Sequence, residues 1–433
     1  MKSFSLLVIC LFLLVGAKAQ TNLKTLVDQK ADQLEQQVIE WRRYFHQYPE
    51  LSNREFKTAE KVTAHLKKLG MEVKTGVAHT GVIGILKGAK PGPVVALRAD
   101  MDGLPVVERV DIPFASKEKS TYLGQEVGVM HACGHDTHVA MLMGAAEILT
   151  GIKNQLAGTV VFIFQPAEEG PPPGEEGGAA LMVKEGVLKS VNADVVFGLH
   201  INSMLEVGKI RYKPEGTLAA ADQFTIKVKG KQTHGSMPWG GVDPITIAAQ
   251  IINGLQTIIS RQTELTKEAA VISIGKIQGG VRNNIIPEEC EMIGTIRTLD
   301  TAMQRIIHEK IILTATKIAE SAGATAEVTI KTAVPVTYND PNLTRLMLPT
   351  LFTAAGEDNV ILTRAVTGAE DFSFFAREIP GFFLFLGGRA KNVDTLDAAP
   401  HHTPDFFIDE SGMKLGVRTL CHLTLDYMKI GQK

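Results

Sequence analysis

The octapeptide HACGHDTH at residues 131–138 places three histidines, one aspartate and one thiol directly ahead of an apolar run. Neutral imidazole and thiolate hold borderline-soft divalent metals such as zinc, and both bind in their deprotonated forms. The segment therefore predicts part of a metal site. The alternative interpretation is a helix start, in which Asp136 or Thr137 caps the first turn and Cys133 is a small buried hydrophobic residue.

Short, β-rich apolar runs alternate with helical stretches in the first half of the chain. Continuous apolar strands between helices are typical of a sheet buried on both faces, and so of an α/β domain. In such sheets, ligands bind at the carboxyl ends of the strands. The predicted helices span residues 23–47, 55–69 and 137–149, and the predicted strands span residues 82–88, 93–100, 159–165 and 193–200.

Polar side chains follow three of these strands. Asp100 and Asp102 follow one strand, Glu168 and Glu169 follow another, and His200 ends a third. Adjacent residues leaving a strand point in different directions, so one glutamate can bind metal while its neighbour faces a reacting water. A capped helix alone does not predict this convergence, which favours the metal site. Asp100 is interpreted as a turn residue, because aspartate is common in turns.

The size and composition of the chain are those of a globular protein with two domains. At 433 residues it exceeds the usual size of a single core. Hydrophobic residues make up 45% and charged residues 21%, with a formal net charge of −2. This charge gives no electrostatic reason to expect nucleic acid or an anionic membrane as a partner.

The first residues have the pattern of an export signal. An initial lysine, an apolar stretch and a small-x-small cleavage pattern make residues 1–19 a predicted signal peptide. The apolar stretch is too short for a stable membrane anchor, so we expect a secreted or periplasmic protein. The mature chain keeps Cys133, Cys290 and Cys421. An odd count in an exported protein argues against a disulfide framework and leaves a thiol for a metal.

A second domain is predicted inside the first. Residues 216–332 give the order strand, helix, strand, strand, helix, strand, which is the βαββαβ order of a ferredoxin-like unit. The first domain would then consist of residues 20–215 and 333–433.

Eight motifs together resemble those of the dinuclear metal-dependent amidohydrolases of the aminoacylase and carboxypeptidase group. The resemblance is to the branch of N-acyl-amino-acid deacylases, hippurate hydrolases and plant auxin-conjugate hydrolases, and it covers nearly the whole mature chain. The motifs, in the family's order, are ALRADMDGLP (96–105), HACGHDTH, FQPAEEG (164–170), GLH (198–200), THGSMP (233–238), NNIIP (283–287), GAEDF (368–372) and HHTP (401–404).

The resemblance implies an architecture and a cofactor. The catalytic domain would have a central mixed sheet flanked by helices, and the inserted ferredoxin-like α+β domain would act as a lid and form a homodimer. Each subunit would hold two divalent ions, with manganese or zinc favoured over cobalt or nickel. The implied ligands are Cys133, His135, Glu169, His200 and His402.

Further roles are implied by the same resemblance. Glu168 would be the general acid/base and Asp102 would orient a ligand, while Cys133 would stand where related branches have a bridging carboxylate. A sulfur ligand softens the site and leaves the metal's identity open. Of the adjacent pair His401 and His402, the family motif selects His402, because the ligand directly precedes Ser, Thr or Asn and then Pro.

Two residues of the inserted domain have more than one interpretation. The resemblance implies that His234 reaches the active site of the other subunit and stabilises the oxyanion there. Alternatively, His234 is a turn histidine between Gly230 and Pro238. Asn284 is similar to a family residue that helps to bind substrate, and its alternative is a turn-forming asparagine before Pro287.

The residues also fit amide hydrolysis without the family. A bound divalent ion lowers the pKa of its water from ~15.7 to ~7, and Glu168 would carry the water's proton to the leaving amine. We therefore expect an exported hydrolase that cleaves the amide of N-acyl or N-aroyl amino acids. The alternatives are a dipeptidase or carboxypeptidase with the same dinuclear site, and a non-catalytic binding protein, which the complete ligand set disfavours.

A cationic clamp for a substrate carboxylate would separate the two enzyme classes. Arg282, Arg297 and Arg345 are available, and the sequence assigns none of them. Residues 333–340 lack the arginine expected of a carboxypeptidase. This difference favours a small N-acyl amino acid over a short peptide as substrate.

Overall fold

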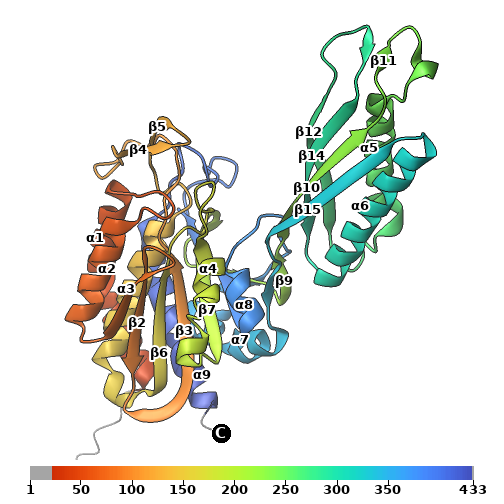
Figure 1. The fold of residues 1–433 in the computed structure, drawn as a ribbon. Helices are drawn as coiled ribbons and strands as arrows, with labels where there is room; N and C mark the ends of the chain where they lie inside the picture. The colour runs from red at the N-terminus through yellow and green to blue at the C-terminus, as the bar shows by residue number, and fades with distance from the viewer. Residues whose placement is uncertain (1–21, 432–433) are drawn as a thin grey trace, which may run out of the picture.

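The computed structural model describes residues 22–431, so the predicted signal peptide, residues 1–19, lies outside the described residues. Figure 1 shows a large unit of layered helices and strands and a smaller, elongated unit beside it. No helix between residues 22 and 431 combines the length and apolarity needed to cross a membrane.

A mixed sheet of eight strands forms the centre of the large unit, in the order β1-β2-β6-β3-β7-β18-β8-β17. The four central strands, β6, β3, β7 and β18, run parallel to one another. The eight strands are β1 (Glu72–Val77), β2 (Gly81–Lys87), β3 (Lys90–Asp100), β6 (Ala157–Gln165), β7 (Val195–Glu206), β8 (Ile210–Tyr212), β17 (Val360–Leu362) and β18 (Gly381–Arg389).

Both faces of this sheet are buried, as predicted from its continuous apolar runs. Along β6, Val160 and Phe162 enter one hydrophobic core while Val161 and Ile163 enter the other, because successive side chains alternate across a sheet. Helices α1, α2, α3, α7 and α9 contribute to the first core and helices α4 and α8 to the second. Their bounds are α1 (Leu23–Gln47), α2 (Phe56–Lys68), α3 (His135–Gly151), α4 (Gly178–Lys184), α7 (Pro341–Ala355), α8 (Ser373–Glu378) and α9 (Met413–Ile430).

The smaller unit has its own antiparallel sheet, in the order β12-β14-β10-β15, and its own core beneath helices α5 and α6. The chain order is the predicted βαββαβ order. The elements are β10 (Ala220–Lys229), α5 (Pro244–Gln262), β12 (Ala270–Gly279), β14 (Glu289–Thr298), α6 (Thr301–Ser321) and β15 (Thr325–Val334).

Three short strand pairs complete the fold. Strands β9 (Glu215–Leu218) and β16 (Thr337–Asn339) pair where the chain enters and leaves the smaller unit. At the far end of that unit, β11 (Thr233–His234) pairs with β13 (Ile285–Ile286). A hairpin of β4 (Lys119–Tyr122) and β5 (Gln125–Gly128) lies at one end of the large unit (Figure 1).

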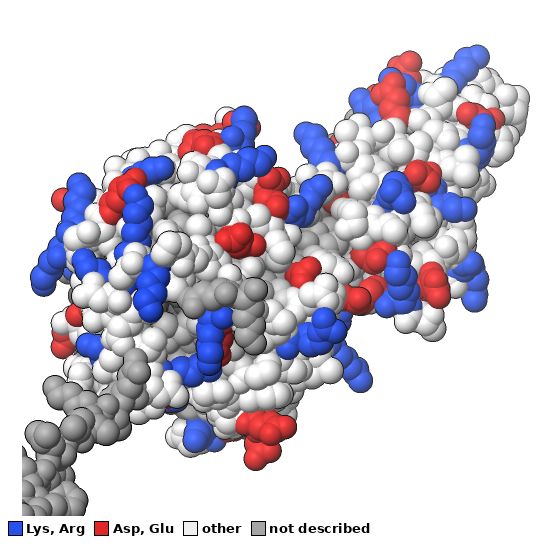
Figure 2. Space-filling model, turned by 90° about the horizontal axis from the view of Figure 1, so that it is seen from below, with Lys and Arg blue, Asp and Glu red and all other residues white. Residues whose placement is uncertain are grey.

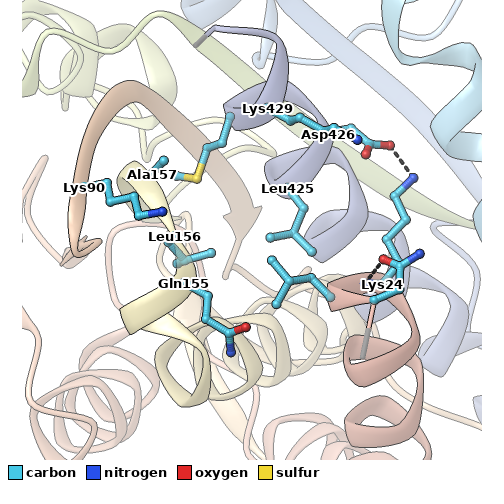
Figure 3. A pocket seen from close by; sticks show the side chains of 11 residues that line it. Lys24, Lys90, Gln155, Leu156, Ala157, Leu425, Asp426 and Lys429 are labelled. Carbon is cyan, nitrogen blue, oxygen red and sulfur yellow. Dashed lines mark hydrogen bonds and ion pairs between the residues drawn. The ribbon is translucent and has the colours of Figure 1, made fainter. Parts of the chain in front are cut away.

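Two other features of the molecule, its surface charge and a cavity between α1 and α9, do not indicate a metal site. On the face drawn in Figure 2, charged side chains of both signs are interspersed over the two units. A cavity of about 440 Å³ lies between the start of α1 and the end of α9 (Figure 3). Its carboxylate, Asp426, pairs with Lys24 at 2.5 Å, and its described lining residues include no histidine or cysteine. It therefore lacks the side chains of a metal site.

Candidate metal centre

The motif residues meet at the carboxyl ends of the parallel strands, around a cavity of about 430 Å³. Glu168 and Glu169 follow β6, and Cys133 lies just before α3. His402 comes from the loop between β18 and α9. His200 lies within β7, which continues to Glu206, so the prediction that it ends its strand is wrong. The strand therefore continues past the cavity.

The donor atoms of the predicted ligand set lie close together. The Cys133 Sγ is 3.4 Å from His200 Nε2 and 3.3 Å from His402 Nε2. The Oε1 of Glu169 is 3.0 Å from His402 Nε2 and 4.0 Å from His135 Nε2. Cys133 thus lies between two of the histidines, where a ligand shared by two ions would lie.

The histidine rings are oriented as metal ligands are. The Nδ1 of His135 faces the Asp102 carboxylate at 3.2 Å, and the Nδ1 of His200 donates to the carbonyl of Ile201 at 2.6 Å. Each ring therefore presents Nε2 to the cavity. The Nε2 of His135 is buried and has no hydrogen-bond partner among the described residues. This orphaned nitrogen fits a metal ion.

The electrostatics of the cavity also fit cations. Burial, helped by the charges of Glu370 and Glu169, raises the pKa of Glu168 well above its usual range. Burial and the same Glu169 charge raise the pKa of the Cys133 thiol. Positive charge in the cavity opposes both shifts, because it stabilises the carboxylate and the thiolate. The residues present therefore fit a pair of divalent ions.

Asp102 joins the two halves of the site. Its Oδ1 faces His135 Nδ1 and accepts the backbone N–H of Glu168 at 3.1 Å, and its Oδ2 accepts the backbone N–H of Glu169 at 3.1 Å. The turn before them is held as well, because Glu55 accepts the N–H of Ala167, which has a φ of +51°. These contacts suit the orienting role that the resemblance implies for Asp102.

Beneath the cavity, a buried ion network replaces the turn predicted around Asp100. Asp100 is fully buried at the end of β3 and lies 2.5 Å from His138 Nδ1 and 2.6 Å from Arg98 Nη1. The turn interpretation is therefore wrong. Arg98 also donates to Glu370 at 2.8 Å and to Asp371 at 2.9 Å, in the GAEDF motif. An arginine inside an apolar strand was the available signal for this network.

The helix-cap interpretation of HACGHDTH is also wrong. Helix α3 begins after Gly134, which has a φ of +89° and makes no side-chain cap. Asp136 points away from the helix end and pairs with Arg42 Nε at 2.7 Å and His46 Nδ1 at 2.9 Å. It anchors α1 to the segment that carries Cys133. This pairing could not be predicted from local spacing, because His46 and Asp136 lie 90 positions apart in the chain.

The structure places His234 and Asn284 together, but not at this cavity. Gly235, the residue after His234, donates its N–H to the carbonyl of Asn284 at 2.8 Å, across the β11–β13 pair. Both residues are exposed, and β11, which carries His234, lies at the far end of the smaller unit (Figure 1). His234 is therefore not among the residues that line the cavity of its own chain.

One arginine does reach the cavity. Arg297, near the end of β14, lines it together with the ligands, and its Nη1 is buried without a hydrogen-bond partner in the described part of the chain. Arg282 lies at the tip of the smaller unit, and Arg345 is exposed on α7, where it donates to Asn342. Of the three arginines considered as a clamp for a substrate carboxylate, Arg297 is the one that lines the cavity.

Cys133→Ser is expected to weaken metal binding by about tenfold or more, since even outer contacts of metal ligands are worth 10–100-fold. Serine keeps the size of the side chain but exchanges sulfur for a harder oxygen. Isothermal titration of metal-free protein with Mn²⁺ or Zn²⁺ measures the change. Cys290→Ser, in the core of the smaller unit, is the matched control. Unchanged affinity and stoichiometry in Cys133→Ser would exclude the sulfur from the site.

Comparison with known proteins agrees with this geometry. Residues 96–426 match the model of peptidase family M20/M25/M40. Thermostable carboxypeptidase 1 of Saccharolobus solfataricus is 42% identical over 395 residues, which are 91% of this chain and 95% of that protein. The N-acetyl-L-cysteine deacetylase of Bacillus subtilis is 36% identical over 380 residues, 88% and 85% of the two chains.

A solved structure has the same fold. The crystal structure of the Bacillus subtilis YXEP protein, described as a dinuclear metal-binding peptidase of the M20 family, superposes with a TM-score of 0.77. The two sequences are 34% identical, and the match covers 92% of this chain and 99% of the other. The mixed central sheet and the inserted second sheet are therefore shared with a dinuclear metal protein.

Proposed function

This chain is a hydrolase of peptidase family M20/M25/M40, and we propose that it hydrolyses the amide of N-acyl or N-aroyl amino acids at a pair of divalent ions. The observation that carries the proposal is the cavity itself. It brings the five donor residues, the additional carboxylate of Glu168 and the unpaired guanidinium of Arg297 together in one space. The amide of an N-acyl amino acid would lie at the five donors and Glu168, and the carboxylate on its amine side would lie at Arg297.

The side chains divide the reaction between them. Two divalent ions held by the five ligands would supply a nucleophilic water at neutral pH and polarise the scissile carbonyl. Glu168, at the border of the cavity, accepts the proton of that water and delivers it to the leaving nitrogen. Asp102 fixes the position of the His135 ring relative to the turn that carries Glu168, because it contacts both.

The carboxylate of the substrate would bind to Arg297. A guanidinium binds a carboxylate through two parallel hydrogen bonds, and its Nη1 has no competing partner among the described residues. The position of Arg297 also bears on the alternative of a carboxypeptidase, which the absence of an arginine in residues 333–340 had disfavoured. The missing arginine in residues 333–340 does not distinguish the two classes, because Arg297 supplies a cation from another strand.

The acyl side of the cavity favours an apolar group. A second cavity of about 370 Å³ adjoins Glu168, and its lining includes Pro171, Leu181, Val334 and Phe374. An acyl or aroyl group would bury apolar surface against these four side chains, which share the cavity with the charged Glu176, Lys184 and Asp371. Carboxypeptidase activity is the second candidate, because of the 42% identity to a carboxypeptidase.

Two further properties belong to the proposal. We propose export to the periplasm or the medium, on the signal pattern of residues 1–19. We also propose a homodimer through the smaller unit, since His234 is exposed there, away from the metal centre of its own chain.

A substrate panel tests the function. Purified protein, with its metal content measured, is assayed for amine release from N-acetyl, N-benzoyl and longer acyl amino acids, beside dipeptides and carboxyl-blocked peptides. We expect the highest kcat/KM for acylated amino acids with a free carboxylate. A preference for unblocked dipeptides would replace the proposal with a peptidase.

Arg297→Ala is expected to lower kcat/KM for N-acyl amino acids by about 10- to 10²-fold, because a charge-assisted contact of ~1.5–3 kcal/mol is lost. The loss should disappear when the substrate is the corresponding N-acyl amino acid amide. Arg345→Ala, on the exposed face of α7, is the control. An equal loss with both substrates would show that Arg297 does not contact the carboxylate.

A further inference from the structure

His401 lies on the wall of the metal cavity but is absent from the implied ligand set. Its ring is half-buried against Phe406, with centroids 4.8 Å apart, and meets the ring of His200 edge-on at 5.3 Å. The loop that carries it is hydrogen-bonded to β7: Ser203 Oγ donates to the carbonyl of Ala399 at 2.8 Å. The position of His401 is therefore set by packing and by hydrogen bonds.

The backbone fixes the tautomer of this ring. The N–H of Ser203 points at His401 Nε2 from 3.2 Å. A ring nitrogen that accepts a hydrogen bond carries no proton, so the N–H of the ring is on Nδ1. Nε2 is occupied by the backbone, and Nδ1 is a donor, so neither nitrogen is free to bind a metal. His401 is thus a hydrogen-bond donor.

The donor faces Cys133. The Nδ1 of His401 is 3.7 Å from Cys133 Sγ, and the carbonyl of Cys133 is the other acceptor beside it. The two remaining imidazoles near the sulfur, His200 and His402, approach it with Nε2, the nitrogens assigned to the metal. Among the described residues in these contacts, His401 is the one whose ring nitrogen is left to donate to the sulfur.

We propose that His401 is a positioning residue, which donates its Nδ1–H to the thiolate of Cys133 and so holds that sulfur as a ligand. This contact adds a donor at the sulfur that the nitrogens of His200 and His402 also approach, and so restricts the position of the sulfur. It also lowers the electron density that sulfur gives to a bound metal, as hydrogen bonds to metal-bound sulfurs do.

The inference rests on the dinuclear site of the proposed function but not on its substrate. Its test uses Co²⁺ added to metal-free protein, because a thiolate bound to Co²⁺ has a charge-transfer absorption in the near ultraviolet. Two variants of equal shape are compared. His401→Asn keeps an N–H group at the position of Nδ1, and His401→Leu has none.

We expect His401→Leu to bind Co²⁺ about tenfold more weakly and to move the charge-transfer band to longer wavelength. His401→Asn should retain most of the affinity and of the band position. An unchanged band and affinity in a folded Leu variant would overturn the inference and assign the proton to the carbonyl of Cys133. The same follows if the Asn and Leu variants behave alike.

Further measurements distinguish failure of the inference from misfolding of the variant and from failure of the proposed function. If circular dichroism shows that the Leu variant does not fold, His401→Gln replaces it, because its amide reaches the Nε2 position and not Nδ1. Normal band position in a folded Gln variant would likewise overturn the inference. A band that shifts as expected, in a protein that cleaves no acylated amino acid, would refute the proposed substrate and support His401. Absence of the band in the unaltered protein would refute the inference along with the Cys133 ligand.

Discussion

Glu168→Gln is expected to lower kcat by about 10²–10⁴-fold and to leave metal binding intact. Glutamine has the shape of glutamate and keeps an oxygen for the N–H of Asp371, which lies 3.4 Å from Glu168 Oε1. The variant therefore removes the proton acceptor and little else. Steady-state kinetics with an N-acyl amino acid measure kcat, and elemental analysis measures the metal content.

The neighbouring glutamate provides the matched comparison. Glu169→Gln changes the predicted ligand, so activity and metal content should fall together. Glu168→Gln should separate them. A Glu168→Gln protein with most of its kcat, or one that has lost its metal, would remove Glu168 from the role of general acid/base.

The environment of Glu168 explains why so large an effect is expected. Burial and the nearby charge of Glu370 raise the pKa of its carboxyl, which makes the carboxylate a stronger base. Arg98 keeps Glu370 in place, through the buried ion pair at 2.8 Å. The cations of the site would draw the pKa back down. The balance between these charges poises Glu168 to take and return a proton.

The sheet and the convergence of the segments that carry the candidate ligands could be predicted from the sequence, for a physical reason. Strands and helices follow from the local spacing of apolar residues, and a helix such as α1 (Leu23–Gln47) has the predicted bounds. The ligands occur in short motifs at the ends of such elements. Parallel strands bring these ends to one edge, so Glu169 and the HACGHDTH segment had to meet.

The supporting contacts could not be predicted, because they join distant parts of the chain. Asp136 binds Arg42 and His46 of α1, and Arg98 binds Glu370 of the GAEDF motif. The spacing of residues along the sequence does not indicate which distant side chains pair. The same limit applied to Arg297, which is one of several arginines in the sequence and the one that the fold brings to the cavity.

His234→Ala is expected to lower kcat by about 10²–10³-fold, the usual cost of removing one oxyanion donor. In this structure, Nδ1 of His234 accepts the N–H of Ser236 at 3.1 Å, so Nε2 carries the proton and points outward as a donor. The ring is exposed on β11, at the far end of the smaller unit from its own metal centre (Figure 1). The proposed homodimer would bring this donor to the metal centre of the other subunit.

Mixing two inactive proteins distinguishes this arrangement from a role within one chain. In a heterodimer of His234→Ala with Glu168→Gln, one site would combine an intact Glu168 with the partner's intact His234, so verified heterodimers should regain about half of the wild-type activity. The other site has both defects. If His234 acted within its own chain, neither site would be complete and no activity would return.

The control is the double variant, His234→Ala with Glu168→Gln, mixed with either single variant. No site in those heterodimers has both residues intact, so activity should stay at the level of the single variants. Inactive heterodimers in the main experiment, verified by differently tagged subunits, would place His234 outside the partner's site. The role implied for Asn284 would then lose support as well, because its carbonyl accepts the N–H of Gly235, next to His234, at 2.8 Å.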